Sequence, residues 1–458
     1  MRARAVLFLV FFALAGLMPL RAEELTSAQI GDLTRAVLYN SDADMEDALK
    51  KLEARGNKDV ISSLIVSSRY RQNDRRIVEA ISRITGEKIN NWNEAMLWQE
   101  GHPEIKPHES FAAFKVGVFA AIDPQFLRFL GPGRAKPENM RIRLEEIAWG
   151  GVHVDGIPSL DNPKLIAAGE ASYLIDTDLV FGVSINGDVR AYPLRIMGWH
   201  EMFNETIGGV PVALAYCTLC GSGILFKTKV EGREKPFIFG SSGLLYRSNK
   251  LMFDRETDSL WNQFTGEPVT GPLAKSGIAL KILPVTITDW KSWKASHPDT
   301  KVLSLETGYS RDYGSGVVYA DYFASAELMF PTLVRDESRV KRKDYVFGIR
   351  GLGIARAWPI EAFKKEKVIN DAFDRRPIVV VGDVTTLTAR AYERGELTFA
   401  PGADEMSLKS GADIWRITED ALIGPKGENL KRIPGHIAYW FAWDGYLGAI
   451  GTVYPDQP

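Results

Sequence analysis

The stretch that decides the fold is Arg190-Ala191-Tyr192-Pro193-Leu194, which returns 166 residues later as Arg356-Ala357-Trp358-Pro359-Ile360. At the same offset, Val180-Phe181-Gly182-Val183 returns as Val346-Phe347-Gly348-Ile349. Chance similarity would not keep one offset over about thirty positions, so the pattern indicates an internal duplication. With small gaps the correspondence reaches a recurring tryptophan pair, Trp290 and Trp293 against Trp440 and Trp443.

The segments between these repeats are strand-like and are punctuated by glycine and proline, as in Leu179–Ile185 and Val210–Tyr216. We therefore predict an α+β protein in which a helical N-terminal domain precedes two duplicated β-rich lobes. The expected boundaries are 136–335 for the first lobe and 336–458 for the second, degenerate lobe.

Residues 23–135 carry apolar side chains at three- and four-residue spacing in short segments, with Gly56 placed to end one helix. This pattern predicts either stacked helical pairs, as in a helical-repeat array, or a plain helical bundle. No chemically reactive residues converge in this domain. We therefore interpret it as a scaffold or as a docking surface for a protein partner.

The first residues resemble a secretory signal peptide. A basic start with Arg2 and Arg4 precedes an apolar run that ends near Leu20-Arg21-Ala22. The alternative is an uncleaved anchor, although the run is short for a membrane span and Pro19 interrupts it. We expect a signal peptide at 1–22, a periplasmic or secreted mature protein and no membrane span after cleavage.

Loss of the three arginines of that segment takes the formal net charge from −2 to −5. An acidic chain of this kind lacks the basic surface that a nucleic-acid-binding protein needs. We therefore expect no nucleic-acid partner.

The two cysteines of the chain occur together in Cys217-Thr218-Leu219-Cys220-Gly221. This spacing suits half of a metal site, a redox dithiol or a tight structural disulfide. A strand-like run precedes Cys217, and glycines follow Cys220. The order strand, Cys-x-x-Cys-Gly, strand is typical of a metal-binding knuckle rather than of a helix N-terminus.

The duplication separates folding features from functional ones. At the 166-residue offset Cys217 falls on Asp383 and His200 on Glu366, so the cysteines and His200 are confined to the first lobe. His200 is the expected third ligand, and Met252 offers a thioether. Such a soft ligand set favours copper or zinc. The alternative for His200 and Met252 is an ordinary role in the core.

Four further residues are expected to surround the site as a pocket, because they lie in polar, glycine-broken or aromatic stretches downstream of the cysteines. These residues are Ser242, Tyr246, Arg255 and Trp261.

Three functions follow from these observations. The first is a periplasmic protein that binds copper or zinc through Cys217, Cys220 and His200, with Met252 as a further ligand. The second is a thiol-disulfide oxidoreductase, or another thiol-dependent enzyme, in which Cys217 is the nucleophile and Cys220 the resolving thiol. The third is a structural or interaction module stapled by a disulfide.

The chain contains several long motifs, namely Glu145–Gly151, Asp155–Pro158, Ala191-Tyr192-Pro193, Trp199-His200-Glu201, Tyr216–Ser222, Ser242–Tyr246 and Asp254–Trp261. With these motifs it resembles a bacterial exported family catalogued as domain of unknown function 3179. The resemblance covers about residues 140–458, and its cysteine motif is Tyr-Cys-Pro-Leu-Cys-Gly-Ser. This chain has Thr218 in place of the proline, which leaves both sulfurs in position. The resemblance implies boundaries and a site, but no activity.

Overall fold

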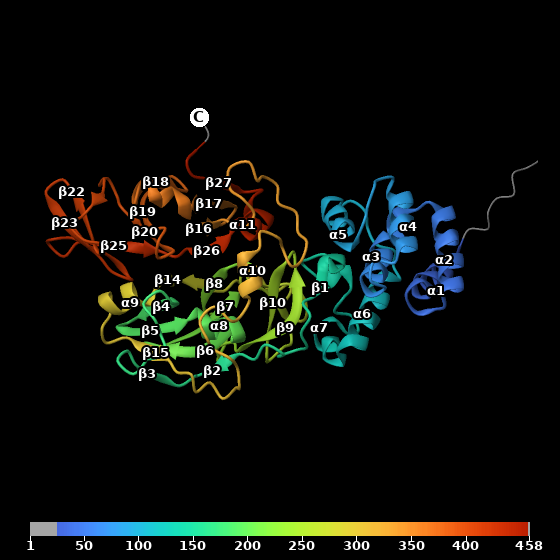
Figure 1. Ribbon diagram of the computed structural model, residues 1–458, viewed down its shortest axis with the longest axis horizontal. Coiled ribbons are helices and arrows are strands. Elements are labelled where there is room, and N and C mark those ends of the chain that lie inside the picture. The colour runs from blue at the N-terminus through green and yellow to red at the C-terminus, as the bar shows by residue number, and fades with distance from the viewer. Residues whose placement is uncertain (1–24, 457–458) are drawn as a thin grey trace, which may run out of the picture.

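The computed structural model describes residues 25–456, of which the N-terminal part is helical and the remainder is rich in strands (Figure 1). A helical domain lies at one end, and two β-rich lobes lie at the other end. The predicted signal peptide falls outside the described residues. Within residues 25–456, the helices are all too short or too polar to traverse a lipid bilayer.

Between residues 25 and 135 the N-terminal domain has seven α-helices, and its helical character agrees with the apolar spacing of this region. Gly56 ends α2 in the left-handed conformation with φ of +65°, and this confirms the predicted helix end. Helices α1–α5 share one apolar core. The bounds are α1 Ser27–Tyr39, α2 Asp42–Arg55, α3 Ile61–Tyr70, α4 Arg75–Thr85, α5 Trp92–Gly101, α6 Phe111–Ile122 and α7 Leu127–Leu130.

The helical domain docks on the first lobe through a second core. Phenylalanines of α6 and α7, such as Phe119 and Phe129, pack against Leu251 and Phe253 of a five-stranded sheet. In order across this sheet, the strands are β1 Ile147–Trp149, β9 Phe239–Tyr246, β10 Asn249–Asp254, β11 Leu260–Asn262 and β12 Glu267–Pro268.

Two more five-stranded sheets and three helices complete the first lobe. One sheet runs β13 Lys281–Leu283, β8 Ser222–Lys227, β7 Val210–Cys217, β6 Met202–Ile207 and β2 Leu160–Asp161. The other runs β14 Thr286–Asp289, β4 Leu179–Ile185, β5 Asp188–Pro193, β15 Lys301–Leu303 and β3 Leu165–Ala167. The helices are α8 Leu194–His200, α9 Trp290–Ser296 and α10 Ala320–Ala324.

The second lobe has a four-stranded and an eight-stranded sheet. The first runs β26 His436–Tyr439, β16 Tyr345–Gly351, β17 Ile354–Pro359 and β27 Gly451–Val453. The second runs β18 Val368–Phe373, β19 Arg376–Asp383, β20 Thr388–Glu393, β25 Asn429–Ile433, β24 Ala421–Ile423, β23 Asp413–Ile417, β22 Ser407–Ser410 and β21 Ala400–Pro401. A 3₁₀ turn spans Ile360–Lys364, and helix α11 spans Trp440–Leu447.

The two lobes are joined by a shared core and by a buried ionic cluster. One apolar cluster contains Phe181 and Tyr216 of the first lobe together with Phe347 and Trp358 of the second. Glu419 of the second lobe accepts a hydrogen bond of 2.7 Å from Thr286 Oγ1 of the first. Burial would raise the pKa of Glu419, but Arg390 and Arg432 hold it well below the usual range.

In each lobe a tryptophan packs directly on a strand glycine. A Cβ added to Gly182 would lie 2.2 Å from the Trp293 ring, and one added to Gly348 would lie 2.0 Å from the Trp443 ring. Any larger residue must therefore displace the indole. The recurrence of these glycines and tryptophans in the sequence is thus a requirement of packing.

We expect Gly348→Ala to lower the free energy of unfolding by about 3 kcal/mol, because the new methyl group overlaps the buried indole of Trp443. Gly169→Ala is the matched control, since its Cβ would meet nothing within 4 Å. Urea unfolding followed by tryptophan fluorescence measures both variants. Equal stability of the two variants would contradict the packing argument.

Candidate functional site

Cys217 and Cys220 lie at the two ends of a tight turn between two antiparallel strands. Cys217 is the last residue of β7 and pairs with Ser222, the first residue of β8. This confirms the predicted order of strand, cysteine turn and strand. Gly221 has φ of +57°, and an added Cβ would lie 2.7 Å from the Tyr345 ring, so glycine is needed here.

The two thiols are free and in direct contact, with 2.8 Å between the sulfur atoms. Cys220 is fully buried. Its sulfur accepts a hydrogen bond of 3.2 Å from Asn249 Nδ2 and donates one of 3.4 Å to Ser248 O. Burial, and then the neighbouring Cys217, raise the pKa of the Cys220 thiol well above its ordinary value. Cys220 is therefore held in its protonated form.

Cys217, in contrast, lines a small cavity of about 40 Å³. A cavity of this size holds a few waters or a ligand of very few atoms. Cys220 is not among the lining residues, so the two thiols differ in access. The residues that line the cavity are Gly150, Val152, Ile157, Glu201, Cys217, Leu219, Ser241, Gly243, Leu244, Leu245, Lys250 and Tyr319.

A buried ion pair forms the polar wall of this cavity. Lys250 Nζ lies 3.1 Å from Glu201 Oε2, and the two side chains are only 6% and 10% exposed. Thr218 Oγ1, inside the cysteine turn, donates a hydrogen bond of 2.8 Å to Glu201 Oε1. Burial, and then the charge of Glu201, raise the pKa of Tyr319 and keep its phenol neutral.

The backbone places Glu201 beside Cys217. Tyr216 N donates a hydrogen bond of 2.8 Å to Glu201 O, which sets the two segments side by side. The second lobe has the same bond 166 residues further on, from Gly382 N to Lys367 O at 3.0 Å. There the side chains at the corresponding positions, Lys367 and Asp383, form an ion pair of 2.6 Å.

A carboxylate and an ammonium group therefore lie in the wall of the cavity that the Cys217 thiol also lines. In such surroundings a carboxylate can exchange a proton with the thiol, and a fixed cation stabilises negative charge. The arrangement suits chemistry that begins at the Cys217 sulfur.

We expect Lys250→Met to lower the free energy of unfolding by about 3 kcal/mol, because it leaves the Glu201 carboxylate buried without its cation. The double variant Glu201→Gln with Lys250→Met removes both charges and is expected to recover much of this loss. Urea unfolding at neutral pH measures the free energy of unfolding of the unmodified protein, of Lys250→Met and of the double variant. A double variant no more stable than Lys250→Met would contradict the buried pair.

His200, the predicted third metal ligand, has other partners at both ring nitrogens. Nδ1 lies 2.9 Å from Pro158 O, and Nε2 lies 2.6 Å from the hydroxyl of Tyr313. Burial lowers the pKa of His200 and favours the neutral ring. Among residues 25–456, histidine, cysteine, aspartate and glutamate side chains do not gather in threes as a metal site requires.

The other predicted site residues do not line the Cys217 cavity. Met252 and Trp261 are fully buried in another apolar cluster of the first lobe, separate from that of the cysteines. Trp261 Nε1 donates a hydrogen bond of 2.9 Å to Asp254 Oδ2.

The remaining three pocket candidates have structural partners. The hydroxyl of Ser242 accepts a hydrogen bond of 3.1 Å from Leu244 N. Tyr246 belongs to the core beneath the helical domain. Arg255 forms a two-pronged ion pair with Asp155, at 2.9 and 3.0 Å.

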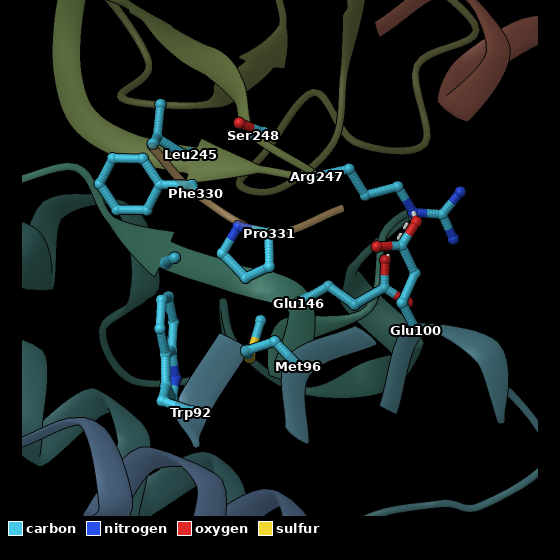
Figure 2. Close-up of a pocket in the computed structure, with 10 residues that line it drawn as sticks. Trp92, Met96, Glu100, Glu146, Leu245, Arg247, Ser248, Phe330 and Pro331 are labelled. Atoms are coloured by element: carbon cyan, nitrogen blue, oxygen red, sulfur yellow. Dashed lines mark hydrogen bonds and ion pairs between the residues drawn. The ribbon is translucent and has the colours of Figure 1, made fainter. Parts of the chain in front are cut away.

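A second cavity lies between helix α5 and the β9–β10 hairpin (Figure 2). Trp92 and Met96 of α5 face Leu245 and Phe330 across it. Leu245 lines both this cavity and the Cys217 cavity, so the two spaces share a wall residue.

Two glutamates beside this second cavity bind Arg247 at the tip of the β9–β10 hairpin. Arg247 Nε lies 2.7 Å from Glu146 and 3.6 Å from Glu100 (Figure 2). Burial raises the pKa of Glu100 to about 7, although Arg247 partly opposes this shift. The adjacent residue, Ser248, contacts Cys220 through its carbonyl oxygen. The helical domain is thus connected to the cysteine turn.

Because the pKa of Glu100 is raised in the folded state, the protein should lose stability as pH rises from about 4.5 to 7. We expect Glu100→Gln to abolish about 2–3 kcal/mol of this loss. Urea unfolding at pH 5 and pH 8 measures the difference, with the exposed Glu104→Gln as control. An unchanged pH dependence in Glu100→Gln would contradict the assignment.

The family model described as "Protein of unknown function (DUF3179)" matches residues 154–449, more than half of the 458-residue chain. The chain therefore belongs to this family. The match includes the cysteine turn, Glu201 and Lys250. It excludes the helical domain and also β1, although β1 pairs with β9 in the same sheet. Neither curated proteins nor solved structures yielded a match.

Sequence reasoning missed Glu201, Lys250 and Asn249. A signal for Glu201 was present, because Lys367 occupies its position in the second lobe and Glu201 is therefore as specific to the first lobe as His200. Lys250 is a charged residue in the buried strand β10, and an internal lysine of this kind calls for an acidic partner.

Proposed function

We propose that this protein is a thiol-based oxidoreductase in which Cys217 reacts with the substrate and Cys220 resolves the product. The observation that carries the proposal is the unequal access of two touching thiols. Cys217 lines a cavity, whereas Cys220 is buried behind it with its sulfur 2.8 Å away. One sulfur is placed to attack and the other to form an internal disulfide.

The burial of Cys220 and the raised pKa of its thiol also give the two cysteines different roles. The thiolate is the attacking form, and the raised pKa of Cys220 disfavours it at that residue. Cys220 becomes useful once Cys217 has reacted, because its sulfur already lies next to the Cys217 sulfur. The carboxylate of Glu201 offers the proton acceptor that Cys217 needs.

The organisation around this site supports further proposals. We propose that the two lobes arose by duplication, since each carries the paired strands, the glycine–tryptophan contact and the same backbone bond beside the site. We propose that the mature protein is exported, on the sequence of residues 1–22, and that the N-terminal helices dock a protein partner.

The redox proposal is tested by equilibrating the protein with glutathione buffers of graded ratio, followed by acid quenching, alkylation and mass spectrometry. We expect a reversible two-electron transition between a dithiol and a Cys217–Cys220 disulfide. Brief alkylation of the reduced protein should label Cys217 before Cys220, because only Cys217 lines the cavity. Cys217→Ser and Cys220→Ser should each lose the transition.

A disulfide that stays oxidised at every glutathione ratio would contradict the proposal and favour the stapled structural module. Binding of copper or zinc stays a prediction, and metal analysis of protein purified without chelators tests it. About one equivalent of metal, lost in both cysteine variants, would favour the metal-binding function.

A further inference from the structure

We propose that the Cys217 chamber reduces a small hydroperoxide, with Glu201 as the group that moves the proton. This inference rests on the oxidoreductase proposed above and names its substrate class. Three observations carry it: the size of the chamber, the contact of the two sulfurs, and the buried ion pair in the wall.

The small size of the chamber favours a small substrate over a large disulfide. Cys217 is 2% exposed and reaches a space of about 40 Å³. Exchange with a protein disulfide requires the incoming sulfur, its neighbouring sulfur and their chains to approach the thiolate. A hydroperoxide presents two oxygen atoms, which a space for a few waters accommodates.

The ion pair supplies a carboxylate that can accept a proton and an ammonium group that can stabilise negative charge. The first step needs both groups. The Cys217 proton passes to Glu201, and the thiolate attacks the nearer peroxide oxygen. The O–O bond breaks as the S–O bond forms, and the leaving oxygen takes the proton back from Glu201 as water or an alcohol. Lys250, 3.1 Å from Glu201, stabilises the negative charge during this transfer.

The second thiol completes the reaction. Cys217 is now a sulfenic acid, and the Cys220 sulfur attacks the Cys217 sulfur from its contact position. The S–S bond forms, the S–O bond breaks, and the hydroxyl leaves as water with the Cys220 proton. Two electrons pass from the thiols to the peroxide, and an external dithiol returns the disulfide to the reduced form by exchange.

An acyl-transfer reaction would use the same nucleophile, acid and cation, but two features disfavour it. A chamber of about 40 Å³ is small for an acyl group together with a leaving amine. A second thiol in contact with the nucleophile would also serve no step of hydrolysis. The observations therefore favour the peroxide.

The experiment mixes the reduced protein with hydrogen peroxide in a stopped-flow instrument and follows disulfide formation by quenched mass spectrometry. We expect oxidation about 100-fold faster than that of free cysteine at the same pH, which is the gain that positioned proton transfer supplies. Hydrogen peroxide should react faster than cumene hydroperoxide, because the chamber excludes the aryl group. In Cys220→Ser, dimedone should trap a sulfenic acid at Cys217.

Glu201→Gln is expected to slow this oxidation by about 100-fold and to regain rate at alkaline pH, where bulk hydroxide replaces the internal base. Glu205→Gln is the matched control. Glu205 is a buried glutamate on β6 that pairs with Arg190 and does not line the chamber, so its rate with peroxide should not change.

Two results would overturn the inference. If the dithiol titrates reversibly with glutathione but reacts with peroxide no faster than free cysteine, the proposed oxidoreductase function is retained and the peroxide substrate is rejected. Turnover of p-nitrophenyl acetate through an acyl-Cys217 adduct, without accelerated peroxide reduction, would assign acyl transfer instead. If no reversible couple is found, the proposed function itself falls.

Discussion

The backbone of the cysteine turn is held by groups from three distant parts of the chain, and the site depends on this constraint. Tyr439 N of the second lobe donates to Cys220 O at 2.8 Å. The hydroxyl of Tyr322 donates to Leu219 O at 2.6 Å. The β9–β10 hairpin supplies the carbonyl oxygen of Ser248 to the Cys220 thiol. Groups from three separate segments thus hold this five-residue turn, and with it the two sulfurs, in place.

The second lobe serves the site although it carries no cysteine. Its position beside the first lobe is fixed by the shared apolar core and by the buried carboxylate of Glu419. It then closes the cysteine turn through β26 and the ring of Tyr345. The second lobe therefore supports the cysteine turn without contributing a thiol.

The helical domain, the β-rich lobes and the strand–turn–strand setting of the cysteines could be predicted because each depends on local periodicity and turn chemistry. The polar wall of the Cys217 cavity, which Glu201 and Lys250 form, could not be predicted. Glu201 follows helix α8 in the left-handed conformation, with φ of +55°, and leads directly into β6. Consecutive residues there contact different surroundings: His200 meets Pro158 and Tyr313, whereas Glu201 meets Thr218 and Lys250. Sequence adjacency does not reveal which of the two reaches the thiol.

Leu245 belongs to the walls of two cavities. Cys217 lines one of them, and the aromatic and acidic groups beneath helix α5 line the other. Helix α5 contributes Trp92, Met96 and Glu100 to this other cavity, so the docking of the helical domain sets the shape of that space. The docking of a domain that carries neither cysteine thus shapes a space that shares a wall residue with the Cys217 cavity.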